Sequence, residues 1–156
     1  MITIDETLAF IKSAHAGQTD KAGAPYWHHP VAVMERLTAP SDDERHAALL
    51  HDVVEDTAVT LDDLRRRGYG EEVVAIVALL TRDPSSGVAY LDWIRSIAGA
   101  GNAAAIRVKI ADNEHNSDPA RLAQLPPEKR GIKSRYERSL KILRAAATET
   151  SIGRGQ

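Results

Sequence analysis

Residues 47–56 have the sequence AALLHDVVED, an apolar run interrupted by four ionisable side chains. The apolar residues on both sides of the interruption predict a helix that packs against a core. A helix turns by about 100° per residue, so His51 and Glu55 are stacked on it, and so are Asp52 and Asp56. The three carboxylates in this wedge, which also holds an imidazole, repel each other unless water or a cation compensates them. A histidine next to an aspartate on a helix therefore indicates half of a metal site.

The composition limits the class of protein. The chain has 156 residues, of which 43% are hydrophobic, and this suits one globular domain with a core. Its formal net charge of -2 disfavours broad binding to nucleic acids. The chain contains no cysteine, so any metal would need nitrogen and oxygen ligands. The N-terminus does not resemble a signal peptide, and no apolar run approaches the length that spans a membrane. We expect a cytoplasmic protein without a membrane or nucleic-acid partner, and its oligomeric state stays open.

The hydrophobic pattern is helical almost throughout. Capping boxes predict helices that begin after Thr3, Ser41 and Thr60, and the helix after Ser41 is expected to carry His51 and Asp52. Apolar side chains at helical spacing predict further helices at 31–37, 71–81, 90–97 and 103–110, and a last helix after Pro126-Pro127. Residues 17–25 and 83–87 are predicted loops. The expected fold is an all-α bundle in a single domain over 1–147, followed by a flexible tail over 148–156.

Two other segments supply candidate metal ligands. His29 lies in the segment PYWHHP, and Asp112 lies in KIADNEHN, each at the edge of an apolar helical segment. Two histidines and two aspartates form a ligand set that suits Mn²⁺ or Fe²⁺, and also Zn²⁺ or Mg²⁺. Such an ion would lower the pKa of a bound water and polarise a phosphoryl oxygen. Glu55 and Asp56 lie one turn beyond the ligands, where they are placed for water orientation or proton transfer.

Four blocks of the sequence, in order, resemble a known family. They are AHAGQ at 14–18, GAPY with HPV at 23–31, LLHDVVEDT at 49–57, and KIAD with Asn116 at 109–116. The order His29, His51-Asp52, Asp112 resembles the H…HD…D pattern of HD-domain phosphohydrolases. The four blocks are similar, more narrowly, to the hydrolase domain of the RelA/SpoT family and to the small alarmone hydrolases. Together they span most of the chain.

The resemblance implies an HD-domain helical bundle that binds one divalent metal, usually Mn²⁺, and a small nucleotide substrate. The implied reaction removes the 3′-pyrophosphate of guanosine tetra- or pentaphosphate and leaves GDP or GTP. The family's metal ligands carry over to His29, His51, Asp52 and Asp112. Its catalytic acidic pair carries over to Glu55 and Asp56, and its substrate contacts to Lys21, Asn116 and Tyr136. Each substrate contact also has a simpler interpretation: Lys21 as a solvated loop lysine, Asn116 as a helix-end residue and Tyr136 as a core residue.

The chain departs from the family pattern at several positions. Where the family usually has an arginine that stacks on guanine, this chain has Asp20. An acidic group offers no cation–π stacking and repels a phosphate. Asn113-Glu114 replaces a basic or apolar pair, and the synthetase region of long family members is not present, so synthesis is not expected. Two alternatives stay open: an HD phosphohydrolase of another nucleotide phosphoester, such as the 2′-phosphate of NADPH, and a non-catalytic helical regulatory domain.

Overall fold

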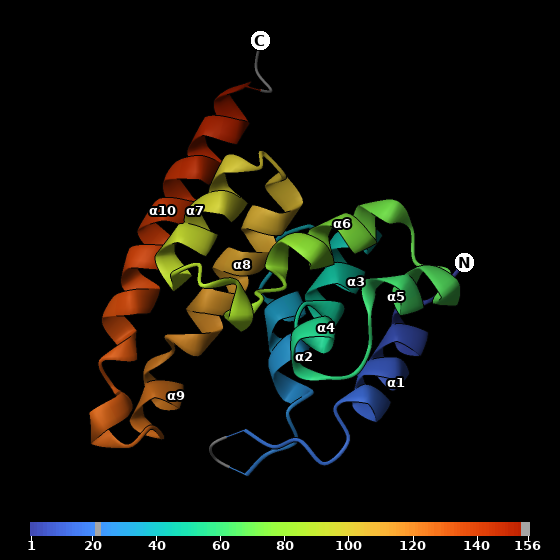
Figure 1. Cartoon of the computed structure of the whole chain (residues 1–156), viewed down its shortest axis with the longest axis horizontal. Coiled ribbons are helices and arrows are strands. Elements are labelled where there is room, and N and C mark those ends of the chain that lie inside the picture. Colours follow the sequence, from blue (N-terminus) through green and yellow to red (C-terminus); the bar gives the residue numbers. More distant parts are fainter. Residues whose placement is uncertain (21–22, 154–156) are drawn as a thin grey trace. The chain divides into compact units, whose positions relative to one another are not determined.

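A computed structural model of the chain describes residues 1–20 and 23–153 (Figure 1). These residues form helices joined by loops, and among them there is no strand, only an isolated bridge between Thr19 and Pro25. The predicted all-α fold is therefore confirmed. The chain divides into two compact units, Met1–Asp83 and Pro84–Gln156, called unit 1 and unit 2 below. The expectation of a single domain over 1–147 stays a prediction.

Unit 1 is built around the helix that precedes the His51-Asp52 pair. Its helices are α1 (Ile4–Ala14), α2 (His28–Glu35), α3 (Asp42–Leu50), α4 (Val53–Asp56), α5 (Leu61–Arg67) and α6 (Glu71–Leu80). The capping boxes at Thr3, Ser41 and Thr60 are confirmed, each with both reciprocal hydrogen bonds that satisfy the first free N–H groups of a helix. Helix α3 packs against α1, α2 and α6, and its residues 47–50 have no exposed surface. This packing fixes the end of α3, where the metal-site candidates begin.

The expectation of one continuous helix through the His51-Asp52 pair is wrong. Helix α3 ends at Leu50, His51 is its C-cap, and Asp52 is the N-cap of the four-residue helix α4. The imidazole of His51 donates from Nδ1 to the carbonyl oxygen of Ala48 at 2.7 Å. In a continuous helix that carbonyl accepts the backbone N–H of residue 52 instead. Because the apolar periodicity continues across the break, the pattern alone gave no sign of it.

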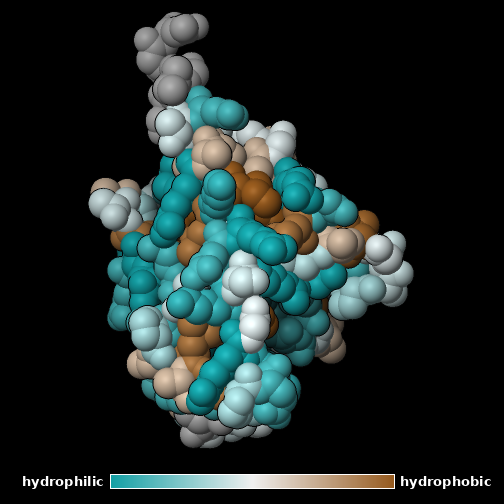
Figure 2. Space-filling view, turned by 90° about the vertical axis from the view of Figure 1, so that its left-hand side faces the viewer, coloured by the Kyte–Doolittle hydropathy of each residue, from teal (hydrophilic) through white to brown (hydrophobic). Residues whose placement is uncertain are grey.

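Unit 2 consists of helices that pack along one long C-terminal helix. Its elements are η1 (Pro84–Ser86), α7 (Tyr90–Gly99), α8 (Ala103–Asn116), α9 (Pro119–Ala123), η2 (Pro127–Lys129) and α10 (Ile132–Gly153). Helix α10 buries Leu140, Leu143 and Ala146 and packs against α7 and α8. Figure 2 shows the face on which α10 lies, where hydrophilic side chains dominate and hydrophobic ones are visible between them.

Two helices of unit 2 are longer than the sequence predicted. Helix α8 continues past Ile110 to Asn116, so Asp112 lies inside a helix rather than at its edge. Helix α10 continues past Ala147 to Gly153. The flexibility expected for 148–156 stays a prediction. Within the described residues no helix is both long and apolar enough to cross a bilayer, and the cytoplasmic location stays a prediction.

Candidate metal centre

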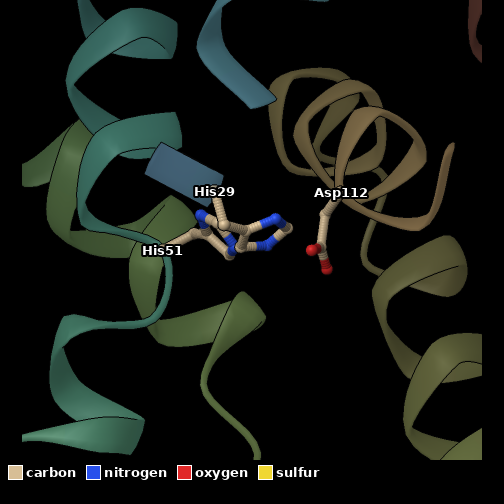
Figure 3. A group of neighbouring side chains, drawn as sticks. All are labelled: His29, His51 and Asp112. Atoms are coloured by element: carbon tan, nitrogen blue, oxygen red, sulfur yellow. The ribbon is translucent and has the colours of Figure 1, made fainter. Parts of the chain in front are cut away.

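His29 is held in the first turn of α2. This helix begins at His28, three residues before the predicted start, because proline at the third position has no N–H to lose there. The His29 side chain is 3% exposed. Figure 3 shows His29 on α2 and His51 at the end of α3, together with Asp112 on α8, and all three are buried.

Within unit 1, two histidines converge on one carboxylate oxygen. The Nε2 atom of His51 lies 3.0 Å from Oδ2 of Asp52, and the Nε2 atom of His29 lies 3.8 Å from the same oxygen. The two imidazole rings are 5.3 Å apart between centroids. Neighbouring side chains on a continuous helix point in different directions, so the break after Leu50 is what lets His51 and Asp52 meet.

The donor set of this cluster fits a cation. Because Nδ1 of His51 donates to the Ala48 carbonyl, a neutral imidazole presents a lone pair at Nε2. That lone pair faces a carboxylate oxygen at 3.0 Å, a contact between two acceptors that requires a proton or a metal ion. A histidine that donates its other ring N–H to a backbone carbonyl is the usual arrangement for a metal ligand.

Tyr26 supports Asp52 from the other side. Its hydroxyl donates a hydrogen bond to Oδ2 of Asp52, the oxygen that faces the two histidines. The Tyr26 ring lies 5.1 Å from the ring of His15 and 5.8 Å from that of His29. Tyr26 is therefore positioned to fix the rotamer of Asp52, a role that the sequence pattern did not predict.

The two members of the predicted acidic pair have different surroundings. Oε1 of Glu55 accepts the backbone N–H of Arg82 at 2.7 Å, so that carboxylate is tied to the residues after α6. Asp56 is exposed, yet partial desolvation and then the nearby Asp52 carboxylate raise its pKa above the ordinary 3.8. Gln18 opposes this shift through a side-chain hydrogen bond to Asp56. Asp56 is thus close enough to Asp52 and His51 for their charges to act on it.

A buried histidine holds Gln18 in place. The Nδ1 atom of His15 bonds Oε1 of Gln18 at 2.9 Å, and His15 is 3% exposed. Since an amide oxygen only accepts, the imidazole is the donor, and the amide N–H₂ of Gln18 is left for Asp56. His15 is therefore a buried histidine that is held by a hydrogen bond. The AHAGQ block contains both residues, but their link to Asp56 needed the fold.

Asp112 lies in unit 2 and has a cation of its own. The Nζ atom of Lys109 lies 2.7 Å from Oδ2 of Asp112, and Nδ2 of Asn116 donates to Oδ1 at 3.0 Å. Lys109 and Asp112 are 7% and 4% exposed. The sequence analysis did not predict these contacts, but the spacing of three and four residues along α8 is the signal that could have, since such residues are neighbours on a helix.

The three predicted substrate contacts have separate outcomes. Asn116 is the last residue of α8, and its amide group contacts Asp112. Tyr136 is half-buried on α10, where burial first, and then the negative charge of Asp112, raise the pKa of its hydroxyl. Lys21 lies outside the described residues.

Known proteins are similar to this chain in sequence and in fold. A family model described as an HD domain matches residues 7–89. A probable GTP pyrophosphokinase of Mycobacterium leprae is 39% identical over 128 residues, which cover 78% of this chain and 16% of that protein. The bifunctional (p)ppGpp synthase/hydrolase SpoT of Escherichia coli is 36% identical over 128 residues, which cover 76% of this chain and 18% of that protein. The chain thus spans less than a fifth of these curated relatives.

A solved structure extends the likeness to nearly the whole chain. It is described as a metazoan ortholog of SpoT that hydrolyzes ppGpp and plays a role in starvation responses. The two structures match with a TM-score of 0.74 at 25% sequence identity, over 97% of this chain and 95% of that one.

Proposed function

Because the chain belongs to the HD-domain family, we propose that it is a metal-dependent hydrolase that removes the 3′-pyrophosphate of guanosine tetra- or pentaphosphate. The products are pyrophosphate and GDP or GTP. The observation that carries the proposal is the convergence of two buried histidines on the Asp52 carboxylate, in a chain similar to (p)ppGpp hydrolases.

An HD domain implies a divalent metal. We propose that His29, His51, Asp52 and Asp112 hold it and that the ion is Mn²⁺, which accepts imidazole and carboxylate ligands together. Asp112 is included because it is a buried carboxylate in the position that the family pattern assigns to the last ligand. When bound, the ion would supply Lewis-acid polarisation of a phosphoryl oxygen and acidify water.

The acidic pair supplies the proton chemistry. In the reaction a water oxygen bonds to the phosphorus attached to the 3′ oxygen, and the bond between that phosphorus and the 3′ oxygen breaks. The water loses one proton, and the leaving 3′ oxygen gains one. We assign the first transfer to the Asp56 carboxylate, because its raised pKa makes it a stronger base than an ordinary aspartate. Glu55, held through Arg82, is the second member of the pair.

Three further residues are proposed to bind the substrate. The amide group of Asn116 donates to Asp112, so its Oδ1 atom is the one offered to the nucleotide. The hydroxyl of Tyr136 stays protonated at neutral pH, since its pKa is raised, and it can donate to a phosphate oxygen. Lys21 is assigned a phosphate contact on the resemblance alone.

Product analysis tests the proposed reaction. The purified chain, loaded with Mn²⁺, is incubated with ppGpp, and the products are separated by anion-exchange chromatography. We expect equal amounts of GDP and pyrophosphate, and no turnover by an Asp52→Asn variant. Release of orthophosphate, or unchanged ppGpp under conditions in which the metal is bound, contradicts the proposal.

Asp20 favours a second candidate, the hydrolysis of another nucleotide phosphoester such as the 2′-phosphate of NADPH. Its Oδ1 atom accepts a hydrogen bond from the backbone N–H of Ala24 at 3.0 Å, so the acidic side chain is bonded to a residue of the same loop. The test measures the turnover of each nucleotide in a panel by wild type, Asp20→Asn and Asp20→Arg. The amide variant keeps an oxygen for Ala24 and removes the charge. If neither variant gains ppGpp turnover relative to the other nucleotides, Asp20 does not set specificity.

The non-catalytic alternative predicts a different result. A regulatory domain that only retained the residues of the site would contain no metal after purification in Mn²⁺ and would hydrolyse no nucleotide in the panel. Elemental analysis together with the product assay separates this outcome from an enzyme with a different substrate.

A further inference from the structure

Among residues 1–20 and 23–153, Arg135 is a cation without an acidic partner. Its Cζ atom lies 3.6 Å from the centroid of the Tyr90 ring, so the guanidinium stacks on that ring. Its Nε atom is buried and has no hydrogen-bond partner among the described residues. No carboxylate of the described residues forms an ion pair with Arg135. Taking a guanidinium partly out of water is unfavourable unless an anion compensates it.

The ring under Arg135 is itself fixed. The hydroxyl of Tyr90 donates to Oδ1 of Asn113 at 3.3 Å, and Asn113, which has no exposed surface, also bonds Ser139. The Trp93 ring meets the Tyr90 ring edge-on at 5.6 Å. Arg135 therefore rests on a surface that is already ordered, which lowers the entropy lost when it binds a ligand.

A second cation lies close to the same aromatic pair. The Nζ atom of Lys109 is 5.9 Å from the centre of the Tyr90 ring and 4.6 Å from that of Trp93. Lys109 has Asp112 as its counterion, at 2.7 Å, whereas Arg135 has none among the described residues. Among the described residues, Arg135 thus adds a positive charge beside the Lys109–Asp112 ion pair. An anion is the ligand that balances it.

We propose that Arg135, held flat on Tyr90, binds a phosphoryl oxygen of the substrate. The planar fork of an arginine suits a phosphate group, to which it can donate two parallel hydrogen bonds. The ligand of Arg135 is a phosphate or pyrophosphate anion. Only the assignment of this anion to ppGpp rests on the proposed function. Tyr136, the next residue along α10, belongs to the same surroundings.

Binding of inorganic pyrophosphate tests the proposal without turnover. The full chain, with no metal added, is titrated with pyrophosphate by isothermal calorimetry. The Arg135→Gln variant should bind pyrophosphate about 10- to 100-fold more weakly, as expected for loss of a hydrogen bond to a charged group. Arg135→Lys, which keeps the charge but loses the fork, should fall between wild type and Arg135→Gln. Arg138→Gln is the matched control, since Arg138 is exposed on the same helix and loses the same charge.

Three outcomes decide the matter. If Arg135→Gln binds as wild type does, or no more weakly than Arg138→Gln, the proposal is overturned. If wild type binds no pyrophosphate, it is overturned as well. If pyrophosphate binding depends on Arg135 but no nucleotide is hydrolysed, the anion site stands and the proposed function fails.

In an active enzyme, Arg135→Gln should raise KM more than it lowers kcat, because it removes binding rather than proton transfer. Thermal melts of each variant confirm that it folds.

Discussion

The two aspartates proposed as metal ligands have opposite surroundings. Asp52, in unit 1, faces the Nε2 atoms of two histidines and accepts a hydrogen bond from Tyr26. Asp112, in unit 2, contacts the ammonium group of Lys109 and the amide group of Asn116. The charge of Asp52 faces two imidazoles, whereas the charge of Asp112 is matched by an ammonium group.

This difference separates metal binding from folding. A carboxylate with its own lysine is compensated whether or not a metal is bound, and removing it would leave a buried ammonium uncompensated and destabilise the folded unit. A carboxylate that faces the lone pair of His51 gains most when a cation binds between them. Metal affinity should therefore depend more strongly on Asp52, and stability without metal more strongly on Asp112.

The largest effect is expected for Asp52→Asn. Loss of the carboxylate should lower Mn²⁺ affinity by more than about 100-fold, since even changes to residues behind the ligands cost 10- to 100-fold. Metal content after dialysis, measured by elemental analysis, checks this. Asp42→Asn is the control, because Asp42 is an exposed acid on α3 with a surface ion pair to Arg45. Equal metal content in both variants would remove Asp52 from the ligand set.

Asp112→Asn should be the more destabilising change in the metal-free protein. It takes the carboxylate away from the buried Lys109 ammonium, at a cost of about 2 kcal/mol. Urea unfolding of the metal-free chain compares this variant with Asp52→Asn, for which little loss is expected. If Asp52→Asn is the less stable of the two, the comparison between the two aspartates is wrong.

Tyr26→Phe tests whether the hydroxyl prepares Asp52 for the metal. The ring and its packing are kept, and only the hydrogen bond to Asp52 is lost. Mn²⁺ affinity should fall about 10-fold. A titration of the metal-free protein with Mn²⁺ measures it, and Tyr69→Phe provides a control, because its hydroxyl bonds Thr7 instead. An unchanged affinity for Tyr26→Phe would mean that the hydroxyl does not position Asp52.

A smaller effect is expected at Gln18. Gln18→Ala removes the amide that bonds Asp56, and kcat should fall up to about 10-fold while metal affinity is kept. A double-mutant cycle with Asp56→Asn provides the sharper measurement. If Gln18 acts through Asp56, its removal costs nothing further in the Asp56→Asn background. Additive losses would assign Gln18 a separate role.

The smallest effect concerns His46, a histidine of unit 1 outside the cluster. Its Nδ1 atom bonds Thr7 at 2.9 Å, and burial lowers its pKa below the ordinary 6.5. The other charges that act on it are those of Asp42, Asp43 and Arg45. A lowered pKa means that the unfolded chain binds the proton more readily, so stability is full above pH 6.5 and is lost as the pH falls below it.

Urea unfolding at pH 8 and pH 5.5 checks this pH dependence. His46→Gln should lose less stability between the two pH values than wild type does. An identical loss in the variant would assign the pH dependence to other groups.

Local signals in the sequence predicted much of the fold. The helices after Thr3, Ser41 and Thr60 were predicted because a capping box is complete within four residues. Asp112 and Asn116 were identified, but the contacts of Asp112 with Asn116 and with Lys109 were not predicted, although the spacing of these residues on a helix indicates both. The end of α3 at Leu50 was missed, because the apolar periodicity runs on through Val53-Val54.

Contacts between distant segments could not be predicted. Tyr26 reaches Asp52 across 26 residues, and Glu55 reaches Arg82 across 27. Arg135 stacks on Tyr90, which is still further away in the sequence. Neither an arginine nor a tyrosine in a sequence indicates which residue it will contact. Helical periodicity indicates which face of a helix is buried, but it does not indicate which other helix packs against that face.

The break between α3 and α4 has a consequence for how such a site can evolve. His51 and Asp52 are consecutive residues, and the distance between their ligand atoms is set by the backbone of a single turn. The fully buried residues just before the turn hold the end of α3 against its neighbours, so a core substitution that shifts this end would move both ligand atoms together. Selection on core packing and selection on this ligand pair therefore act on adjoining positions, and the core beside the turn is constrained by the pair that follows it.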